Sequence, residues 1–460
     1  QFSTPTITVE EIQDLVEKSL MKVRPEVAKK YIIYREWRNT ERDKKTQMKQ
    51  VMDGIVAIDK NDVNLSNANM SSHTPAGQMM TFASEVTKDY TYKYLLPKRF
   101  AEAHQLGDIH IHDLDYYPTK TTTCIQYDMD DLFERGFRTK NGSIRTPQSI
   151  QSYATLATII FQTNQNEQHG GQAIPAFDFF MAKGVAKSFR KHLASFINFY
   201  VAMENGNQAD EKSIRTLIKE YLPSIKSTEA ERETLRIALV ALQIIIDKEH
   251  LARIVEKAYQ QTRKDTHQAM EGFIHNLNTM HSRAGAQTPF SSINYGMDTS
   301  TEGRMVMKNM LLVTEAGLGN GETAIFPIQI FRVKDGVNFN PGEPNYDLFK
   351  LSCRVSAKRL FPNFSFQDAP FNLQYYKEGH PETEIAYMGC RTRVIGNVND
   401  PEREITYGRG NLSFTSINLP RIAILANKNI DWFFSELDRK IDLVVEQLLE
   451  RFEIQAKKKV

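Results

Sequence analysis

The sequence of 460 residues is too long for one small hydrophobic core, so we expect one large domain and a smaller one. Its 58 lysines and arginines almost balance its 56 aspartates and glutamates, which disfavours a protein that coats nucleic acid but leaves small phosphorylated ligands open. The longest mostly apolar run, residues 237–246, is far shorter than the roughly 20 residues that span a bilayer. Three cysteines without a CxxC pair indicate a reducing cytoplasm rather than a disulfide scaffold.

The N-terminal stretch predicts two helices. Thr8 and Glu11 form the Thr-x-x-Glu pattern of a capping box, and apolar residues at helical spacing follow it. Pro25 is typical of the first turn of a second helix. The charged stretch 35–49 indicates an exposed helix or a linker. We therefore divide the chain into a small helical segment, 1–45, and a main domain, 46–460.

The main domain combines long helical patterns with short strands, which predicts an α/β fold. Apolar residues at helical spacing predict helices over 149–163, 177–203 and 229–274. Apolar or β-branched runs predict strands over 107–112, 121–127, 323–333 and 386–394.

The last helix is expected to begin at Asp431, which suits an N-cap. Its apolar residues recur three or four positions apart, as on the core-facing side of an amphipathic helix. We expect this buried stripe to consist of Ile441, Val444, Val445, Leu448, Leu449 and Phe452.

Two glycine-rich stretches, 169–172 and 317–321, are expected to be plain connections. Neither has the spacing of a Walker loop or of a dinucleotide fingerprint. In the first, the glycines end one helix before Pro175 opens another, and the second links a helix to a strand.

His110, His112 and Asp113 form the first candidate site. Residues two apart in a strand share one face, so both imidazoles can point at one site. Three interpretations stay open: ligation of a metal ion, contact with a substrate, or a structural polar cluster at a strand end. No third ligand is adjacent in sequence, which disfavours a metal centre.

The three cysteines differ in context. Cys124 follows a β-branched run of threonines, which is typical of a small buried strand residue, although a catalytic role stays open. Cys353 lies in a helical pattern and is expected to pack as an ordinary apolar residue. Cys390 follows Gly389, where the backbone can turn tightly, so we expect it at a loop tip, where functional side chains concentrate.

Taken singly these motifs decide little, but their order along the chain is specific. From about residue 46 to the end, the ordered set resembles the class III, anaerobic ribonucleotide reductases of the glycyl radical enzyme family. The segments that carry the resemblance are NLSNANMSSHTPAGQM (64–79), IHIHDLDY (109–116), QTPF (287–290), GLG (317–319), KRLFP (358–362), MGCR (388–391) and GRGN (408–411).

Residues 9–38 resemble the last two helices of an ATP-cone, a regulatory nucleotide-binding module. This resemblance implies control of activity by ATP and dATP. The family's glycyl radical loop and its four-cysteine structural zinc site would follow Val460. The resemblance therefore implies that this chain holds no metal site of its own and stops before the glycine that stores the radical.

The resemblance implies a ten-stranded α/β barrel with a central finger loop, a helical periphery and a small helical N-terminal remnant. It places Cys390 at the loop tip, where it forms a transient thiyl radical, and Cys124 on a neighbouring strand as its partner. Asn411 matches an asparagine that contacts substrate, and Met388 matches a methionine of formate-using members. Cys390 and Cys124 are then expected across one pocket, with Cα atoms within or just beyond the roughly 4.4–6.8 Å of a disulfide.

Two positions depart from the family pattern. Thr123 stands where some members have asparagine, which bears on the reductant, and Gly410 replaces an asparagine, which bears on loop shape. The remaining candidate substrate contacts are His110, His112, Asn69 and Ser72.

The implied reaction is the anaerobic reduction of ribonucleoside triphosphates to deoxyribonucleoside triphosphates, with formate as reductant and nucleotides as allosteric effectors. A thiyl radical removes the C3′ hydrogen, the ribose loses water, and the reductant completes the step in a dry site. The implied partners are a radical-SAM iron–sulfur activating enzyme and further copies of the chain. Helices between residues 149 and 171 are candidates for a homodimer interface that carries a specificity effector. Neither a membrane nor a nucleic acid is expected as a partner.

Three alternatives stay open. The first is a metal-dependent nucleotide hydrolase built on His110, His112 and Asp113. The second is another glycyl radical enzyme, similar to pyruvate formate-lyase, although the motifs of that family are missing. The third is a regulatory subunit that binds nucleotides and performs no chemistry.

Overall fold

The computed structural model describes residues 8–57, 70, 73–139, 142–205, 209–389 and 391–458, without the side chains of residues 43–47 and 205. The chain divides into two compact units, one of residues 1–66 and 72–86 and the other of residues 67–71 and 87–460. None of the described helices combines the length and the apolar character that a membrane span requires. Three predicted site residues lie outside the described residues: Cys390, Asn69 and Ser72.

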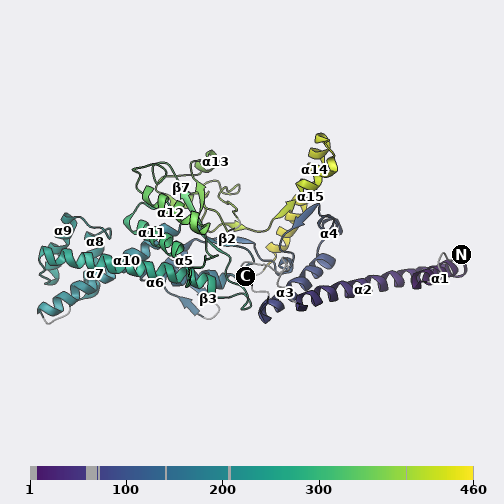
Figure 1. Cartoon of the computed structure of the whole chain (residues 1–460), viewed down its shortest axis with the longest axis horizontal. Coiled ribbons are helices and arrows are strands. Elements are labelled where there is room, and N and C mark those ends of the chain that lie inside the picture. Colours follow the sequence, from purple (N-terminus) through teal and green to yellow (C-terminus); the bar gives the residue numbers. More distant parts are fainter. Residues whose placement is uncertain are drawn as a thin grey trace. The chain divides into compact units, whose positions relative to one another are not determined.

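The first unit contains α1 (Val9–Val23) and α2 (Pro25–Ala57), drawn in purple in Figure 1. The predicted capping box is confirmed: the Glu11 amide donates to Thr8 Oγ1 (3.2 Å), and the Thr8 amide donates to Glu11 Oε2 (2.8 Å). The charged stretch is helical rather than a linker, because α2 runs through it without a break. The boundary at residue 45 stays a prediction.

The second unit is built on a six-stranded sheet. Five of its strands are parallel neighbours, and the sixth, β9, pairs antiparallel with β2 at one edge. The predicted strands near 121–127 and 323–333 are confirmed as β2 and β7, whereas no sequence pattern predicted β5, β6 or β8. In spatial order the strands are β8 (Asn363–Phe366), β7 (Ile328–Val333), β6 (Ser291–Tyr295), β5 (Gln172–Ile174), β2 (Cys124–Gln126) and β9 (Gly410–Asn411).

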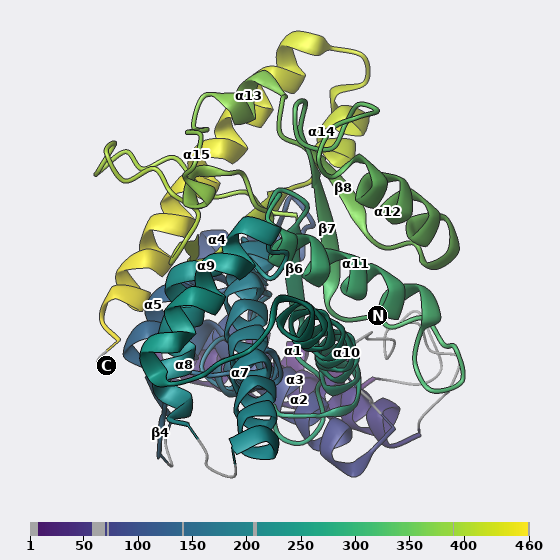
Figure 2. The same cartoon turned by 90° about the vertical axis from the view of Figure 1, so that its left-hand side faces the viewer.

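Helices pack against this sheet and share its core, with α7, α10 and α11 grouped beside β6 and β7 in Figure 2. The predicted helices 149–163 and 177–203 are confirmed as α6 and α7. The single helix predicted over 229–274 is wrong, because Asp247 caps a new helix and divides the segment. The helices are α5 (Met129–Arg135), α6 (Ile150–Asn164), α7 (Phe177–Asn205), α8 (Glu211–Tyr221), α9 (Glu229–Leu239), α10 (Lys248–Thr279), α11 (Thr301–Ala316), α12 (Tyr346–Arg359) and α13 (Pro370–Leu373).

A second, smaller core lies around an antiparallel pair, β1 with β10. Buried residues of α4, β1 and α15 meet there, and β1 confirms the strand predicted at 107–112. A short hairpin, β3 with β4, stands apart from both sheets. The elements of this part are α4 (Lys98–Gln105), β1 (Ile109–Ile111), β3 (Phe137–Thr139), β4 (Gly142–Ile144), β10 (Thr415–Ile417), α14 (Leu419–Ala426) and α15 (Ile430–Ala456). Most of α3 (Pro75–Tyr90) belongs to the first unit.

The prediction for α15 is wrong in two respects. Its N-cap is Asn429, whose side chain accepts from the Trp432 amide, and not Asp431. Of the predicted buried stripe only Val444 is buried and Leu448 half-buried. The other four residues, exposed by 43–58%, are Ile441, Val445, Leu449 and Phe452.

The buried face of α15 is polar instead. Lys440 Nζ donates to Asp108 Oδ2 (2.6 Å), and Gln447 accepts from Thr415 Oγ1 (2.6 Å). Arg451 donates to the His112 carbonyl (2.8 Å). Hydrogen bonds to specific partners therefore fix the orientation of this helix, which an apolar pattern alone cannot indicate.

The predicted α/β class is confirmed, with ten described strands in three sheets. The described strands do not form one closed ring, because β1 and β10 pair only with each other. The strand predicted at 386–394 is wrong. Its described residues make a tight turn with one isolated bridge, Tyr387 with Arg393.

Candidate active site

Cys124 opens strand β2 and is 97% buried, since its exposed fraction is 3%. It stands directly opposite Asn411 in the antiparallel pairing of β2 with β9. The Thr123 amide donates to the Asn411 carbonyl (3.0 Å), which fixes this register. Two of the predicted catalytic residues, 287 positions apart in sequence, are therefore neighbours.

Met388 completes this group. It is fully buried and packs in one small cluster with Cys124 and Ala173, against which Val394 also lies. The structure thus brings Cys124, Met388 and Asn411 together, as the resemblance implied. The cluster itself is apolar, which suits chemistry that water and ionic groups would disturb.

The loop that carries Met388 makes a tight turn. The Met388 amide donates to the Thr392 carbonyl (2.9 Å), and the Arg391 amide donates back to the Met388 carbonyl (2.8 Å). Arg391 has a φ of 65°, in the left-handed region. The residue between Gly389 and Arg391 is the predicted radical cysteine, Cys390, which lies outside the described residues. Its distance to Cys124 stays a prediction.

Two side chains of the sheet hold the loop. Asn294 of β6 accepts from the Tyr387 amide (2.9 Å) and donates to the Tyr387 carbonyl (2.8 Å). Gln126 of β2 donates to the Ala386 carbonyl (3.2 Å). Because both amides are buried in the sheet, they position the loop as if it were a further strand.

A buried ionic network holds the start of the same loop. Arg332 of β7 lies 3.3 Å from an Asp178 oxygen and 2.7 Å from Glu384 Oε2, and its side chain is fully buried. Asp178 also accepts from three successive amides, those of residues 296–298, at 2.8–3.0 Å. Burial, only partly offset by Arg332, raises the pKa of Glu384 to about 7. Burial next to Asp178 likewise raises the pKa of Asp298 to about 6.

Glycines let the backbone close in around Cys124. A Cβ on Gly170 would lie 1.3 Å from the Thr123 carbonyl oxygen, and one on Gly410 would lie 2.3 Å from that of Cys124. A Cβ on Gly389 would meet the ring of Phe290 at 2.6 Å. The stretch 169–172, expected as a plain connection, instead enters strand β5 beside Cys124. The pair of glycines directly before a β-prone run is the sequence feature that could have indicated a strand closely approached by other backbone.

His110 and His112 lie elsewhere, on the strand pair β1–β10. Their ring centroids are 4.5 Å apart, and His112 Nε2 bonds to Ser416 Oγ (2.9 Å). Burial, helped by the neighbouring His110, lowers the pKa of His112. A role for these two residues as substrate contacts stays a prediction.

Asp113 faces His169 rather than the histidine pair, at 3.4 Å from its Nε2. Burial acts to raise the pKa of Asp113, but the interaction with His169 outweighs it and lowers the pKa. Within the described part of the chain, no three His, Cys, Asp or Glu side chains are placed to hold a metal ion together. The geometry gives the metal-dependent hydrolase no supporting observation.

The third cysteine does not belong to the site. Cys353 lies on α12 and is exposed, so the expectation that it packs as an apolar residue is wrong. The apolar positions of that helix that are buried are Leu348 and Val355.

Comparisons with known proteins agree with the resemblance. A family model described as "Anaerobic ribonucleoside-triphosphate reductase" matches residues 66–460, and one described as "ATP cone domain" matches residues 1–40. The anaerobic ribonucleoside-triphosphate reductases of Salmonella typhimurium and Escherichia coli are each 30% identical over 448 residues, which are 97% of this chain and 55% of theirs. The chain thus spans about half the length of the curated relatives it matches.

A solved structure supports the fold. The anaerobic ribonucleotide reductase from Thermotoga maritima, in complex with dATP and CTP, aligns over 99% of this chain and 64% of its own, with a TM-score of 0.51 at 13% identity. At that identity the likeness concerns the mixed α/β fold alone.

Proposed function

Because the chain belongs to the anaerobic ribonucleoside-triphosphate reductase family, we propose that it forms the part of such an enzyme in which ribonucleoside triphosphates are reduced to deoxyribonucleoside triphosphates. The observation that carries the proposal is that buried Cys124 packs with buried Met388 and pairs with half-buried Asn411, beside the turn between Met388 and Thr392. These are the residue types that the reaction requires, gathered from three distant segments.

In this proposal Cys390 acts as a thiyl radical and takes the hydrogen atom from C3′ of the ribose. The 2′-hydroxyl then leaves as water after gaining a proton. Formate supplies the hydride equivalent that replaces it, so the balance is one triphosphate, one formate and one proton to one deoxy product, one CO₂ and one water. Cys124 faces the radical sulfur as its partner, and Asn411 contacts the ribose hydroxyls with a neutral donor and acceptor.

Met388 and the surrounding glycines keep the site dry and closely packed. A thiyl radical is quenched by competing donors, so exclusion of water and of further polar groups protects it. His110, His112, Asn69 and Ser72 are proposed as substrate contacts. The proposed barrel closes around the loop in the whole protein.

The regulatory proposal rests on the ATP-cone match at residues 1–40. We propose that ATP and dATP bind there and switch activity, and that α6 contributes to a homodimer interface with a specificity effector. A glycyl radical, a structural zinc site and a radical-SAM activating enzyme complete the proposed cytoplasmic system.

The test uses full-length protein, activated anaerobically, with Cys390→Ala, Cys124→Ala and Cys353→Ala compared. We expect Cys390→Ala to abolish deoxynucleotide formation and CO₂ release from labelled formate while nucleotide effectors still bind. Cys353→Ala is the matched control, because Cys353 is exposed on α12, and it should keep turnover. Undiminished turnover by the Cys390 variant would reject the proposal.

The Cys124 variant tests whether Cys124 takes part in the reaction or is only a buried residue of strand β2. If Cys124 is the partner of the radical sulfur, its alanine variant loses turnover although the fold, measured by circular dichroism, is unchanged. If turnover persists, Cys124 is only a buried strand residue, and the formate assignment falls with it.

A further inference from the structure

His169 lies beside the start of strand β2, next to the candidate active site. It directly precedes the two glycines that enter β5, and a Cβ on Gly171 would lie 3.8 Å from Cys124 Sγ. The His169 amide donates to the Thr122 carbonyl (3.4 Å). An imidazole is therefore built into the segment that closes around Cys124.

The side chain of His169 is fully buried between two polar partners. Its Nδ1 lies 2.7 Å from Thr121 Oγ1, and its Nε2 lies 3.4 Å from Asp113 Oδ2. Within the described residues Nε2 forms no hydrogen bond of ordinary geometry, so the Asp113 carboxylate is the group that it faces. A hydroxyl, an imidazole and a carboxylate in this order can pass a proton along the row.

Stacking fixes the plane of this imidazole. The Tyr116 ring lies parallel to it, with centroids 5.1 Å apart and an angle of 14° between the planes. The Arg283 guanidinium lies 5.2 Å from the Tyr116 centroid and donates to the Gln165 carbonyl (2.7 and 2.9 Å). Because the ring is clamped from this side and buried, Nδ1 stays directed at Thr121.

Asp113 faces the imidazole as an ionised carboxylate. Its backbone has a φ of 55°, in the left-handed region that few residues other than glycine adopt. Burial acts to raise the pKa of this carboxyl, but His169, Arg451 and His112 together lower it. An ionised carboxylate is the partner that stabilises an imidazolium when one forms.

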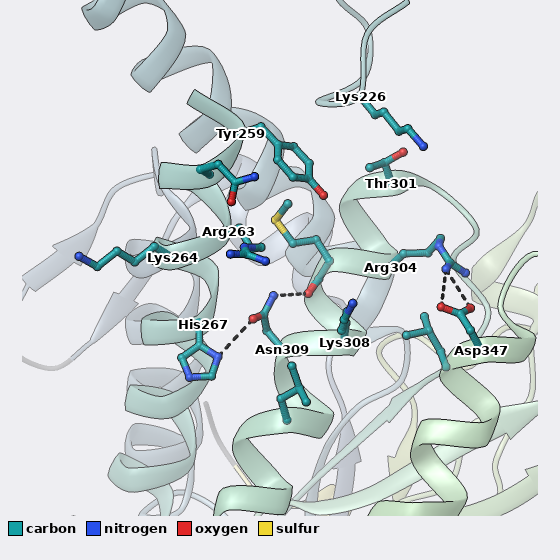
Figure 3. Close-up of a pocket in the computed structure, with 14 residues that line it drawn as sticks. Lys226, Tyr259, Arg263, Lys264, His267, Thr301, Arg304, Lys308, Asn309 and Asp347 are labelled. Carbon is teal, nitrogen blue, oxygen red and sulfur yellow. Dashed lines mark hydrogen bonds and ion pairs between the residues drawn. The ribbon is translucent and has the colours of Figure 1, made fainter. Parts of the chain in front are cut away.

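Two other histidines show what is particular about His169. His267, which lines the cavity between α10 and α11 in Figure 3, faces the neutral amide oxygen of Asn309 (3.2 Å). His250 faces the Asp247 carboxylate (2.5 Å), but these side chains are 49% and 56% exposed. Burial, a carboxylate and a hydroxyl coincide at His169, beside the proposed reaction.

We propose that His169, held by Asp113, passes a proton through the Thr121 hydroxyl to the 2′-oxygen that leaves the ribose as water. This inference rests on the proposed reductase function and assigns a source for the proton of that step, because hydroxide leaves poorly unless it is protonated. Thr121 meets the ribose, and His169 is a positioning residue that acts through it.

The step is balanced in protons and electrons. The Nδ1–H bond of the protonated imidazole breaks as Thr121 Oγ1 takes the proton, and the hydroxyl proton of Thr121 moves to the 2′-oxygen. The C2′–O bond then breaks, its electron pair leaves with the water, and the unpaired electron stays on the ribose. The 3′-hydroxyl returns a proton to the imidazole through Thr121, so C3′ becomes a carbonyl carbon and His169 is protonated again.

The experiment measures turnover against pH in full-length, anaerobically activated enzyme carrying Thr121→Val or Thr121→Ser. Valine keeps the shape of threonine without its hydroxyl, so kcat should fall roughly hundredfold with KM unchanged. Serine restores the hydroxyl and should restore turnover. Wild-type turnover should fall as pH rises through the range in which histidines titrate, about pH 5 to pH 8. His169→Gln, which cannot carry the proton, should be as slow as Thr121→Val and lose this pH dependence.

The control is His250→Gln, which breaks an exposed histidine–carboxylate pair and should keep both the turnover and the pH profile of the wild type. Loss of the 3′ hydrogen, followed with 3′-tritiated substrate, should persist in Thr121→Val, because the radical step precedes the proton transfer and reports an assembled site. Wild-type turnover and pH profile in Thr121→Val, or a Thr121→Ser variant as slow as Thr121→Val, would overturn the relay alone. A wild-type enzyme that forms no deoxynucleotide would overturn the reductase proposal, and the relay with it.

Discussion

Two ionic clusters of the second unit, one buried and one partly exposed, shift the pKa of an acid in opposite directions. Around Arg332, one guanidinium faces the carboxylates of Asp178 and Glu384 with no exposure to water, and burial raises the pKa of Glu384. Around Asp108, one carboxylate meets two cations, Lys440 and Arg421, at 2.6 and 2.8 Å. Burial alone would raise the pKa of Asp108, but the hydrogen bonds from these cations lower it.

Burial is the largest influence on the pKa of Glu384 and prevails there over one cation, whereas at the less deeply buried Asp108 the hydrogen bonds from two cations outweigh burial. An acid whose folded pKa is raised stabilises the fold in its protonated form, and that stability is lost as pH rises. An acid whose folded pKa is lowered stabilises the fold in its ionised form, and that stability is lost as pH falls. The first cluster anchors the loop that carries Met388, and the second anchors α15.

The largest effect is expected from Arg332→Met. The change leaves Asp178 and Glu384 buried without their cation, so the free energy of unfolding should fall by about 3–5 kcal/mol in urea denaturation. Arg354→Met is the control, since Arg354 is 62% exposed in its pair with Glu315 and should cost less than about 1 kcal/mol. Equal losses in the two variants would show that the Arg332 cluster is not desolvated.

Glu384→Gln tests the pH behaviour of the same cluster. Wild-type stability from this group is complete below pH 4.5 and is lost as pH rises through about 7, a loss of about 3 kcal/mol. The glutamine variant cannot ionise, so its unfolding free energy should fall less between pH 5 and pH 8. Glu402→Gln, at an exposed position, should keep the wild-type slope. A steep slope in Glu384→Gln would assign the effect to another group.

Lys440→Met probes the second cluster. Lys440 is buried and donates to Asp108, so its loss should cost about 1.5–3 kcal/mol, less than Arg332 because Arg421 remains. The neighbouring Arg439→Met, 65% exposed in its pair with Glu436, should cost less than about 1 kcal/mol. Thermal unfolding of the two variants measures the difference. If Lys440→Met unfolds at a higher temperature than the wild type, the contribution of this ion pair to stability is contradicted. That result would indicate that α15 turns its exposed apolar side toward the core in the variant.

The smallest effect is expected from Arg421→Met. Arg421 is 39% exposed, so water screens its pair with Asp108, and the cost should stay below about 1 kcal/mol. Combined with Lys440→Met in a double-mutant cycle, it should cost more than the sum of the single changes, because Asp108 then has no cation. Simple additivity would indicate that Asp108 interacts with each cation independently.

The sequence predicted elements that local chemistry determines. The capping box at Thr8, the helices α6 and α7 and the strand β2 all follow from neighbours within a few residues. The resemblance also predicted the grouping of Cys124 with Met388 and Asn411, which no local pattern contains.

Other features depend on partners far away in sequence. β6 is buried on both faces yet reads Ser-Ser-Ile-Asn-Tyr, because Asn294 bonds to the loop that carries Met388, and Ser292 and Tyr295 bond to neighbouring strands. The stripe of α15 was assigned to the wrong face because Asp108 and Thr415 pair with its polar side.

The pairing of β2 with β9 also has a consequence for the order of events during synthesis. Until residue 411 has left the ribosome, β2 has β5 on one side and no strand on the other. At about 5–20 residues per second, the 287 residues from Cys124 to Asn411 take roughly 15–60 s. Throughout that interval the strand that carries Cys124 is an unpaired sheet edge, which can pair with a strand of another nascent chain. The short length of β2, three residues, limits that exposure.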